Sequence, residues 1–258
     1  MPSSPSDTVA PCALILAAGA GRRLGATEPE DARTPKALLD FDGRSLLARH
    51  VEILRGLGIT AITVVIGFKA DLMRDALGAL TDGPAVATAV NPDFREGSVV
   101  SLWAGRAVLR SGRPVILMDA DVLYDRRLMA RLVASTRPGS LLLDREIEPG
   151  DEPVKLCVRD GRIVDFHKRP TEAHEWHGES VGFFRFSADV AKELADRVED
   201  YVAGGRRALE YEEPIRDMIM ASAADRFGFE DISGLPWIEI DFAEDVLKAR
   251  ALLPKIEA

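Results

Sequence analysis

The chain has 258 residues, of which 47% are hydrophobic and 29% are charged. This composition excludes a disordered or fibrous protein, and the length suffices for one large α/β domain with a hydrophobic core. The 42 acidic and 33 basic residues give a formal net charge of -9, which argues against nucleic acid and anionic lipid as partners. Cys12 and Cys157 form no CxxC pair, which fits a reducing cytoplasm.

The start of the chain carries no targeting pattern. Residues 1–11 have neither the basic start nor the apolar middle of a signal peptide, and no apolar run approaches the roughly 18 residues of a membrane span. We therefore expect a soluble cytoplasmic protein without a membrane partner. Residues 1–10 are rich in Pro and Ser and are predicted to form a disordered tail, followed by a single domain over 11–258.

Short apolar runs alternate with amphipathic segments in the first half, as in a sheet covered by helices. The predicted strands lie at 12–17, 62–67, 86–90, 115–118 and 140–143. Predicted helices separate them, at 45–57, 71–80, 98–109 and 126–135. Ser45 is placed to cap the first of these helices and Gly58 to end it. This order predicts successive βα units in a mostly parallel sheet.

The second half is predicted to add antiparallel strands. Segments 155–159 and 162–166 flank Asp160-Gly161, a strong hairpin signal, and 180–186 forms a further strand. The remaining predicted elements are helices at 188–202, 212–223 and 243–253, and a short strand at 237–240. The chain is therefore predicted to be an α/β domain with antiparallel material added to a doubly wound core.

The loop after the first strand is the first candidate site. It contains Gly19 and Gly21, followed by Arg22 and Arg23. Glycines let backbone N–H groups turn toward an anion and arginines add positive charge, so this loop predicts a phosphate site. Arg-Arg-Leu follows the second glycine, so the loop fits neither the Rossmann nor the Walker pattern. A plain βα turn with glycines for tight packing is the alternative.

A second candidate site follows the buried strand 115–118. Asp119 and Asp121 stand at its carboxyl end, the edge where α/β sheets bind ligands. Neighbouring carboxylates favour a shared cation, and Mg²⁺ takes one or two carboxylates together with substrate phosphates and water. Alternatively, Asp119 and Asp125 cap the following turn and helix.

A third candidate site is the segment Trp-Ile-Glu-Ile-Asp at 237–241. Alternation along a strand sends Trp237, Glu239 and Asp241 to one side, with Asp241 at the carboxyl end. Glu244 and Asp245 are placed to stabilise the first turn of the last helix.

Two of these motifs carry a family resemblance. The stretch Leu-Ala-Ala-Gly-x-Gly-x-Arg-Leu at 16–24, with Pro35-Lys36 later, resembles the signature of nucleotidyltransferases that load sugar phosphates, molybdopterin or phosphocholine onto NTPs. Trp-Ile-Glu-Ile-Asp followed by Glu-Asp resembles the closing motif of the phosphocholine cytidylyltransferase-like branch. The resemblance covers about 13–253. It implies a three-layer α/β/α fold with a mostly parallel mixed sheet, in which 11–145 bind the nucleotide and 146–258, with a small antiparallel elaboration, bind the acceptor.

The resemblance also implies an activity and residue roles. The activity is Mg²⁺-dependent transfer of CMP from CTP to a small acceptor of the phosphocholine, phosphoethanolamine or aminoethylphosphonate type, releasing pyrophosphate. Asp121 and Asp241 would hold the metal, and Lys36 and Arg23 would complete the catalytic set. The remaining nucleotide-binding residues would be Ala17, Ala18, Gly19, Ala20, Gly21, Arg22, Gly97, Ser98, Ser101 and Asp119. The acceptor-binding residues would be Lys155, Lys168, Trp176, Glu179, Gly182, Glu212 and Trp237.

Several alternatives stay open at this stage. Segment 96–100 lacks the Thr-Asn-Asn stretch of many phosphocholine-type members, which leaves a sugar phosphate, an inositol phosphate or molybdopterin as acceptor classes. A nucleotide sensor without turnover and an NAD-dependent oxidoreductase are the other functional classes. Trp176 is interpreted either as a packed residue or as a platform for a quaternary ammonium. His167, His174 and His177 are too unevenly spaced for a zinc site. We expect a monomer or a homodimer.

Overall fold

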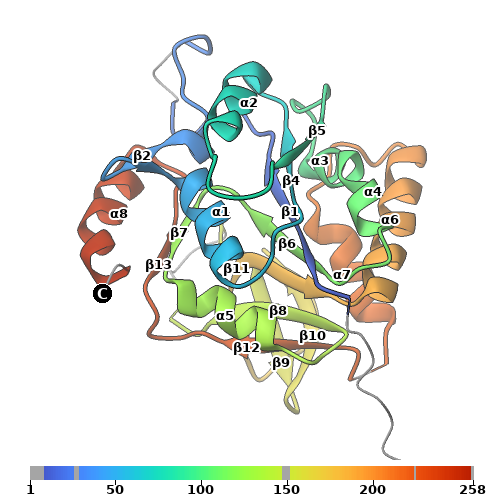
Figure 1. Cartoon of the computed structure of the whole chain (residues 1–258). Helices are drawn as coiled ribbons and strands as arrows, with labels where there is room; N and C mark the ends of the chain where they lie inside the picture. Colours follow the sequence, from blue (N-terminus) through green and yellow to red (C-terminus); the bar gives the residue numbers. More distant parts are fainter. Residues whose placement is uncertain (1–8, 26–28, 147–151, 224, 257–258) are drawn as a thin grey trace, which may run out of the picture.

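The computed structural model describes residues 9–25, 29–146, 152–223 and 225–256. Within these ranges the chain forms a nine-stranded mixed sheet between two layers of helices, which confirms the three-layer α/β/α prediction (Figure 1). Apart from Val9 and Ala10, the tail predicted over 1–10 lies outside the described residues. No described helix is both long and apolar enough to cross a membrane.

Four parallel strands form the first half of the sheet. They are β1 (Cys12–Ala17), β4 (Ile62–Ile66), β5 (Ala87–Val90) and β6 (Val115–Asp119). β1 lies in the middle, with β4 on one side and β6 on the other. Because helices cover both of its faces, β1 is apolar at every position rather than alternating. The carboxyl ends of β1 and β6 therefore meet at one edge of the sheet.

The second half of the sheet is largely antiparallel. Its strands are β8 (Gly139–Asp144), β9 (Lys155–Arg159), β10 (Arg162–His167), β11 (Trp176–Phe186) and β12 (Phe227–Asp231). β11 is antiparallel to β6, β8 and β9, and so joins the two halves. The β9–β10 hairpin turns at Asp160 and Gly161, whose φ angles of 53° and 71° suit a two-residue turn, as the sequence predicts.

Helices pack on both faces of this sheet (Figure 1). One face carries α1 (Leu46–Gly56), α2 (Ala70–Gly78) and α5 (Arg126–Ala134). The other carries α3 (Ser98–Ala104), α4 (Arg106–Leu109), α6 (Ala188–Ala203) and α7 (Glu212–Ala221). Ser45 caps α1 by accepting from the Ala48 amide, as expected. The helix predicted over 98–109 is instead broken at Gly105, which lies directly against Leu14 of β1.

Five short elements and the last helix complete the site edge. β2 (Asp40–Phe41) and β3 (Arg44–Ser45) form a hairpin, and a 3-10 turn spans Lys36–Leu38. β7 (Val122–Tyr124) pairs antiparallel with β13 (Trp237–Glu239), ahead of α8 (Ala243–Ile256). β7 and β12 were not predicted from the sequence. The β7–β13 ladder matters because it brings the chain after β6 next to the chain before α8.

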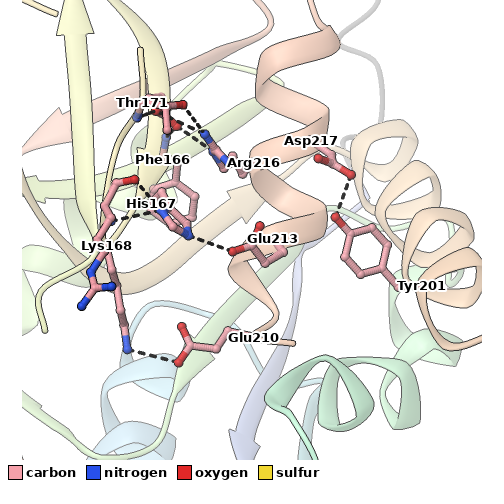
Figure 2. A network of polar contacts seen from close by, with 11 residues as sticks. Phe166, His167, Lys168, Thr171, Tyr201, Glu210, Glu213, Arg216 and Asp217 are labelled. Atoms are coloured by element: carbon pink, nitrogen blue, oxygen red, sulfur yellow. Dashed lines mark hydrogen bonds and ion pairs between the residues drawn. The ribbon is translucent and has the colours of Figure 1, made fainter. Parts of the chain in front are cut away.

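A buried polar cluster fixes α7 to β10. Asp165 is fully buried and accepts from the Arg216 Nε at 2.7 Å and from the amides of Thr171 and Glu172 at 2.7 and 3.1 Å. Figure 2 shows Arg216 reaching from α7 to this cluster, with further contacts from His167 to Glu213 and from Lys168 to Glu210. Burial alone would raise the pKa of Asp165, but the bond from Arg216 and the two amides hold that pKa below its ordinary value.

We predict that Asp165→Ala lowers the free energy of unfolding by about 3 kcal/mol at pH 7, because Arg216 and two amides lose a buried partner. The folded-state pKa lies below the unfolded one, so this contribution is complete above about pH 4 and disappears as the pH falls through the lowered pKa. Urea unfolding from pH 7 to pH 3 measures it. Glu172→Ala, an exposed change in the same loop, should have little effect.

Candidate active site

A cleft of about 800 Å³ opens at the carboxyl edge of the parallel strands. Loops after β1 and β6 line one side, and β11, β13, the loop before α7 and the starts of α3 and α8 contribute further lining residues. Acidic side chains outnumber basic ones along it; the basic ones among the described lining residues are Arg23, Lys36, Lys168 and Lys248. We refer to this space as the acidic cleft.

Three carboxylates gather on the floor of the acidic cleft. Asp121, Glu239 and Asp241 each offer an oxygen, and these oxygens all lie within 4.8 Å of one another. Asp121 lies between β6 and β7, whereas Glu239 ends β13 and Asp241 follows it. The Ile240 amide donates to the Asp121 carbonyl at 2.9 Å, so backbone pairing fixes the distance between the two segments. We refer to these residues as the acidic floor.

Lys36 bridges two members of the acidic floor. Its Nζ lies 3.0 Å from an Asp121 oxygen and 2.6 Å from an Asp241 oxygen. Burial alone would lower the pKa of Lys36, but the charges of these two carboxylates raise it above its ordinary value. The lysine therefore stays positively charged at neutral pH.

The glycine loop makes room for this lysine. Gly21 has a φ of +56°, a conformation that favours glycine, and a Cβ there would lie 3.2 Å from the Lys36 Cγ. Arg23, from the same loop, contacts Asp241 at 2.8 Å and Glu152 at 2.8 Å. Two cations from this part of the chain thus meet the acidic floor.

A second cavity of about 470 Å³ adjoins the acidic cleft and shares Lys36, Arg23 and Asp121 with it. Its lining includes the rest of the predicted phosphate loop, namely Ala17, Gly19, Ala20, Gly21 and Arg22, while Ala18 lines the acidic cleft. The loop thus curves around a space next to the carboxylates, as a phosphate-binding loop must.

Asp119 is enclosed beside the acidic floor. The Tyr211 hydroxyl donates to its Oδ2 at 2.6 Å, and Gly182 lies so close that a Cβ there would come within 2.2 Å of the same oxygen. Burial, followed by the charges of Asp121 and Glu212, raises the pKa of Asp119 well above its ordinary value. Asp119 is therefore a wall residue held in place by Tyr211 and Gly182.

Two further carboxyl groups are poised to titrate near neutral pH. Burial raises the pKa of Glu212 to about 7, and one of its oxygens has no partner among the described residues. Glu239 opens onto the cleft, yet the surrounding protein and the charges of Asp121 and Asp241 raise its pKa to about 8.

The structure places five of the seven predicted acceptor residues in the acidic cleft: Lys168, Glu179, Gly182, Glu212 and Trp237. Trp176 does not line it. Its ring instead packs edge-on against Phe229, with the Arg145 guanidinium 4.0 Å above it. The cation on this tryptophan is therefore one of the protein's own side chains.

Lys155 and Gly97 also do not line the cleft. The Lys155 Nζ donates to the carbonyl of Lys168 at 2.9 Å and so helps to fix the backbone at that lysine. Gly97 contacts the loop before α7: its amide donates to the Arg207 carbonyl, and a Cβ would lie 2.1 Å from the Leu209 oxygen. Ser98 and Ser101, by contrast, do line the cleft.

Sequence reasoning did not assign Glu239 or Asp144 to the site. Glu239 had a visible signal, because strand alternation puts it on the same side as Asp241. Asp144 had none, because the Trp237 Nε1, which donates to it at 2.7 Å, lies far away in sequence.

Residues 13–213 match the model of the MobA-like NTP transferase domain family, so the chain belongs to that family. It is 27% identical to a CMP-5'-(3-aminopropyl)phosphonate synthase of Streptomyces rubellomurinus, over 94% of this chain and 39% of the relative. It is 22% identical to a CTP:phosphoglutamine cytidylyltransferase of Campylobacter jejuni, over 91% and 97% of the two chains.

The fold of the CTP:phosphocholine cytidylyltransferase of Streptococcus pneumoniae is similar, with a TM-score of 0.74 and 22% identity over 95% of this chain and 100% of the other. The chain also spans about half the length of two other curated relatives. It therefore carries a nucleotidyltransferase domain with the three-layer fold that the sequence motifs imply.

Gly182→Ala should destabilise the protein by at least about 2 kcal/mol, because it combines a strained backbone with a collision at Asp119. Gly205→Ala is the matched control, since Gly205 has a φ of +77° against +75° for Gly182 but open space around its Cβ. The control should lose only about 1 kcal/mol. Equal losses in denaturant unfolding would show that contact with Asp119 is unimportant.

Proposed function

We propose that the protein transfers CMP from CTP to the phosphate or phosphonate oxygen of a small acceptor and releases pyrophosphate. The carrying observation is the approach of Asp121 and Asp241 to one another beside the glycine loop, with Lys36 between them. Relatives named for transfer of CMP or use of CTP support the choice of nucleotide.

The acidic floor suits Mg²⁺ as a cofactor. Its donors are carboxylate oxygens within 4.8 Å of one another, the hard ligands that Mg²⁺ prefers, with no His or Cys among them. We propose Asp121 and Asp241 as the ligands, with Glu239 as a third carboxylate. When bound there, Mg²⁺ would neutralise charge on the triphosphate next to the scissile bond.

The protein's own residues account for positioning and charge balance. The glycine loop would bind the triphosphate through its amides, and Lys36 and Arg23 would exchange their carboxylate partners for phosphate oxygens. An oxygen of the acceptor forms a bond to the α-phosphorus of CTP. The bond from that phosphorus to the pyrophosphate oxygen breaks, and pyrophosphate leaves with the electron pair. Since the acceptor oxygen is already anionic, no general base is required.

The acceptor would lie between β11 and the loop before α7. Lys168, held 3.1 Å from Glu210, is the cation placed to meet the acceptor's phosphate or phosphonate. Glu179 and Glu212 on the same side of the cleft favour an acceptor that also carries an amine. This acidic surrounding argues for aminoalkyl phosphate or phosphonate acceptors over sugar phosphates.

The decisive experiment measures pyrophosphate release with each NTP and a panel of acceptors: 2-aminoethylphosphonate, phosphoethanolamine, phosphocholine, inositol phosphate and a sugar phosphate. We expect turnover with CTP and an amine-bearing acceptor, and its loss in EDTA. Asp121→Asn and Asp241→Asn should each lower kcat at least about 100-fold. Glu244→Gln, a carboxylate lining the cleft outside the acidic floor, is the control.

Wild-type turnover in both Asp variants would remove these residues from the mechanism. CTP binding without pyrophosphate release across the whole panel would instead support a nucleotide sensor.

Lys168→Met should raise the KM for the acceptor about tenfold and leave the KM for CTP nearly unchanged, because one charged hydrogen bond to the acceptor anion is lost. Lys248→Met, on another wall of the same cleft, is the matched control and should change neither constant. Steady-state kinetics with each substrate varied in turn would separate the two. An unchanged acceptor KM in Lys168→Met would exclude this lysine from acceptor binding.

A further inference from the structure

A separate cavity of about 430 Å³ lies between α1, β7 and the start of α5. None of the described residues that line it also lines the acidic cleft or the adjoining glycine-loop cavity. Its volume falls within the range of about 300–1,000 Å³ that is usual for small-molecule sites. The proposed transfer reaction assigns it no role. We refer to it as the α1 cavity.

Among its described lining residues the α1 cavity has more basic than acidic side chains, in a protein of net charge -9. The basic ones are Arg44, Arg49 and Arg126, and the acidic one is Glu52, which pairs with Arg44 at 3.0 Å. Arg49 is buried and donates to the Phe41 carbonyl, whereas Arg126 is exposed and has no ion pair among the described residues. The charge of Arg126 therefore favours an anion at this end of the cavity.

Two buried side chains of the α1 cavity carry polar atoms without a partner. His50 and Tyr124 are only 1% and 2% exposed, and neither the His50 Nδ1 nor the Tyr124 hydroxyl has a hydrogen bond among the described residues. The His50 Nε2 lies 3.1 Å from the Ala120 carbonyl, which only accepts, so this nitrogen carries the proton and Nδ1 is an acceptor. Buried polar atoms are nearly always paired, so these two point to a ligand.

We propose that the α1 cavity is a second ligand site, which binds a small organic oxyanion. A phosphate or carboxylate head would meet Arg126. The body of the ligand would lie against Leu46, Ile53 and Leu123, and a hydroxyl at its buried end would lie beside Tyr124 and donate to the His50 Nδ1. The proposal does not depend on which reaction the acidic cleft performs.

The α1 cavity is structurally joined to the acidic floor. His50 bonds to the carbonyl of Ala120, the residue between Asp119 and Asp121. β7, which forms one wall of the cavity, pairs with β13 so that Val122 stands opposite Glu239. An occupant would therefore contact the strand that spaces the floor carboxylates.

The test is isothermal titration of the full chain with 4-hydroxyphenyl phosphate and with 4-hydroxybenzoate, one probe for each head group and each with a hydroxyl that can donate to the His50 Nδ1. Arg126→Glu reverses the exposed charge. Gly56→Phe fills the cavity without changing charge, since a Cβ at Gly56 meets no atom within 4 Å. Arg131→Glu, an exposed charge reversal on the same helix outside the cavity, is the matched control. We expect at least tenfold weaker binding in the first two variants and no change in the control.

The preferred head group is the one whose probe binds more tightly. Binding that survives Arg126→Glu and Gly56→Phe but is lost in Lys36→Met would place the anion in the acidic cleft and overturn the proposal. Failure of both probes to bind the wild-type protein would also overturn it. If Arg126→Glu does not fold, Gly56→Phe decides the question alone, because it alters only free volume.

Discussion

The Lys36 ammonium between the carboxylates of Asp121 and Asp241 is the contact on which the site geometry depends. The two carboxylates belong to segments that are far apart in sequence, one after β6 and one after β13. Like charges at this separation repel each other, and a cation between them turns that repulsion into attraction. Because the lysine follows the glycine loop, the same contact also fixes the loop over the acidic floor.

Backbone pairing supplies the rigidity that this electrostatic contact needs. The β7–β13 ladder sets the spacing of the two segments. The hydrogen bond from the Ile240 amide to the Asp121 carbonyl adds one more backbone contact at the end of this ladder. Asp245, at the start of α8, accepts from the amides of Asp241 and Phe242 at 3.1 and 2.8 Å. The carboxylate of Asp241 is thus positioned from both sides, by a strand before it and a helix after it.

Local patterns were enough to predict the layers and much of the cleft. Apolar runs and helical periodicity located β1, β4, β6 and α1, because burial on a sheet or a helix face leaves a regular trace in sequence. β7 was missed because three residues after an acidic turn show no alternation. Trp176 was predicted on the acceptor side because its ring could stack on a quaternary ammonium, yet its position on β11 directs it onto Phe229. Such placements depend on pairing between distant segments, which periodicity does not encode.

The two ends of the cleft are held by different forces. The end at the glycine loop follows the central parallel strands, where close apolar packing allows little change without cost. The other end lies on β11 and before α7, and α7 is tied to β10 by polar contacts around Asp165 and Arg216 (Figure 2). The polar contacts around Asp165 thus fix the position of α7 and, with it, the end of the loop that precedes α7. At the other end the glycine loop is constrained by packing, because Gly21 must admit Lys36.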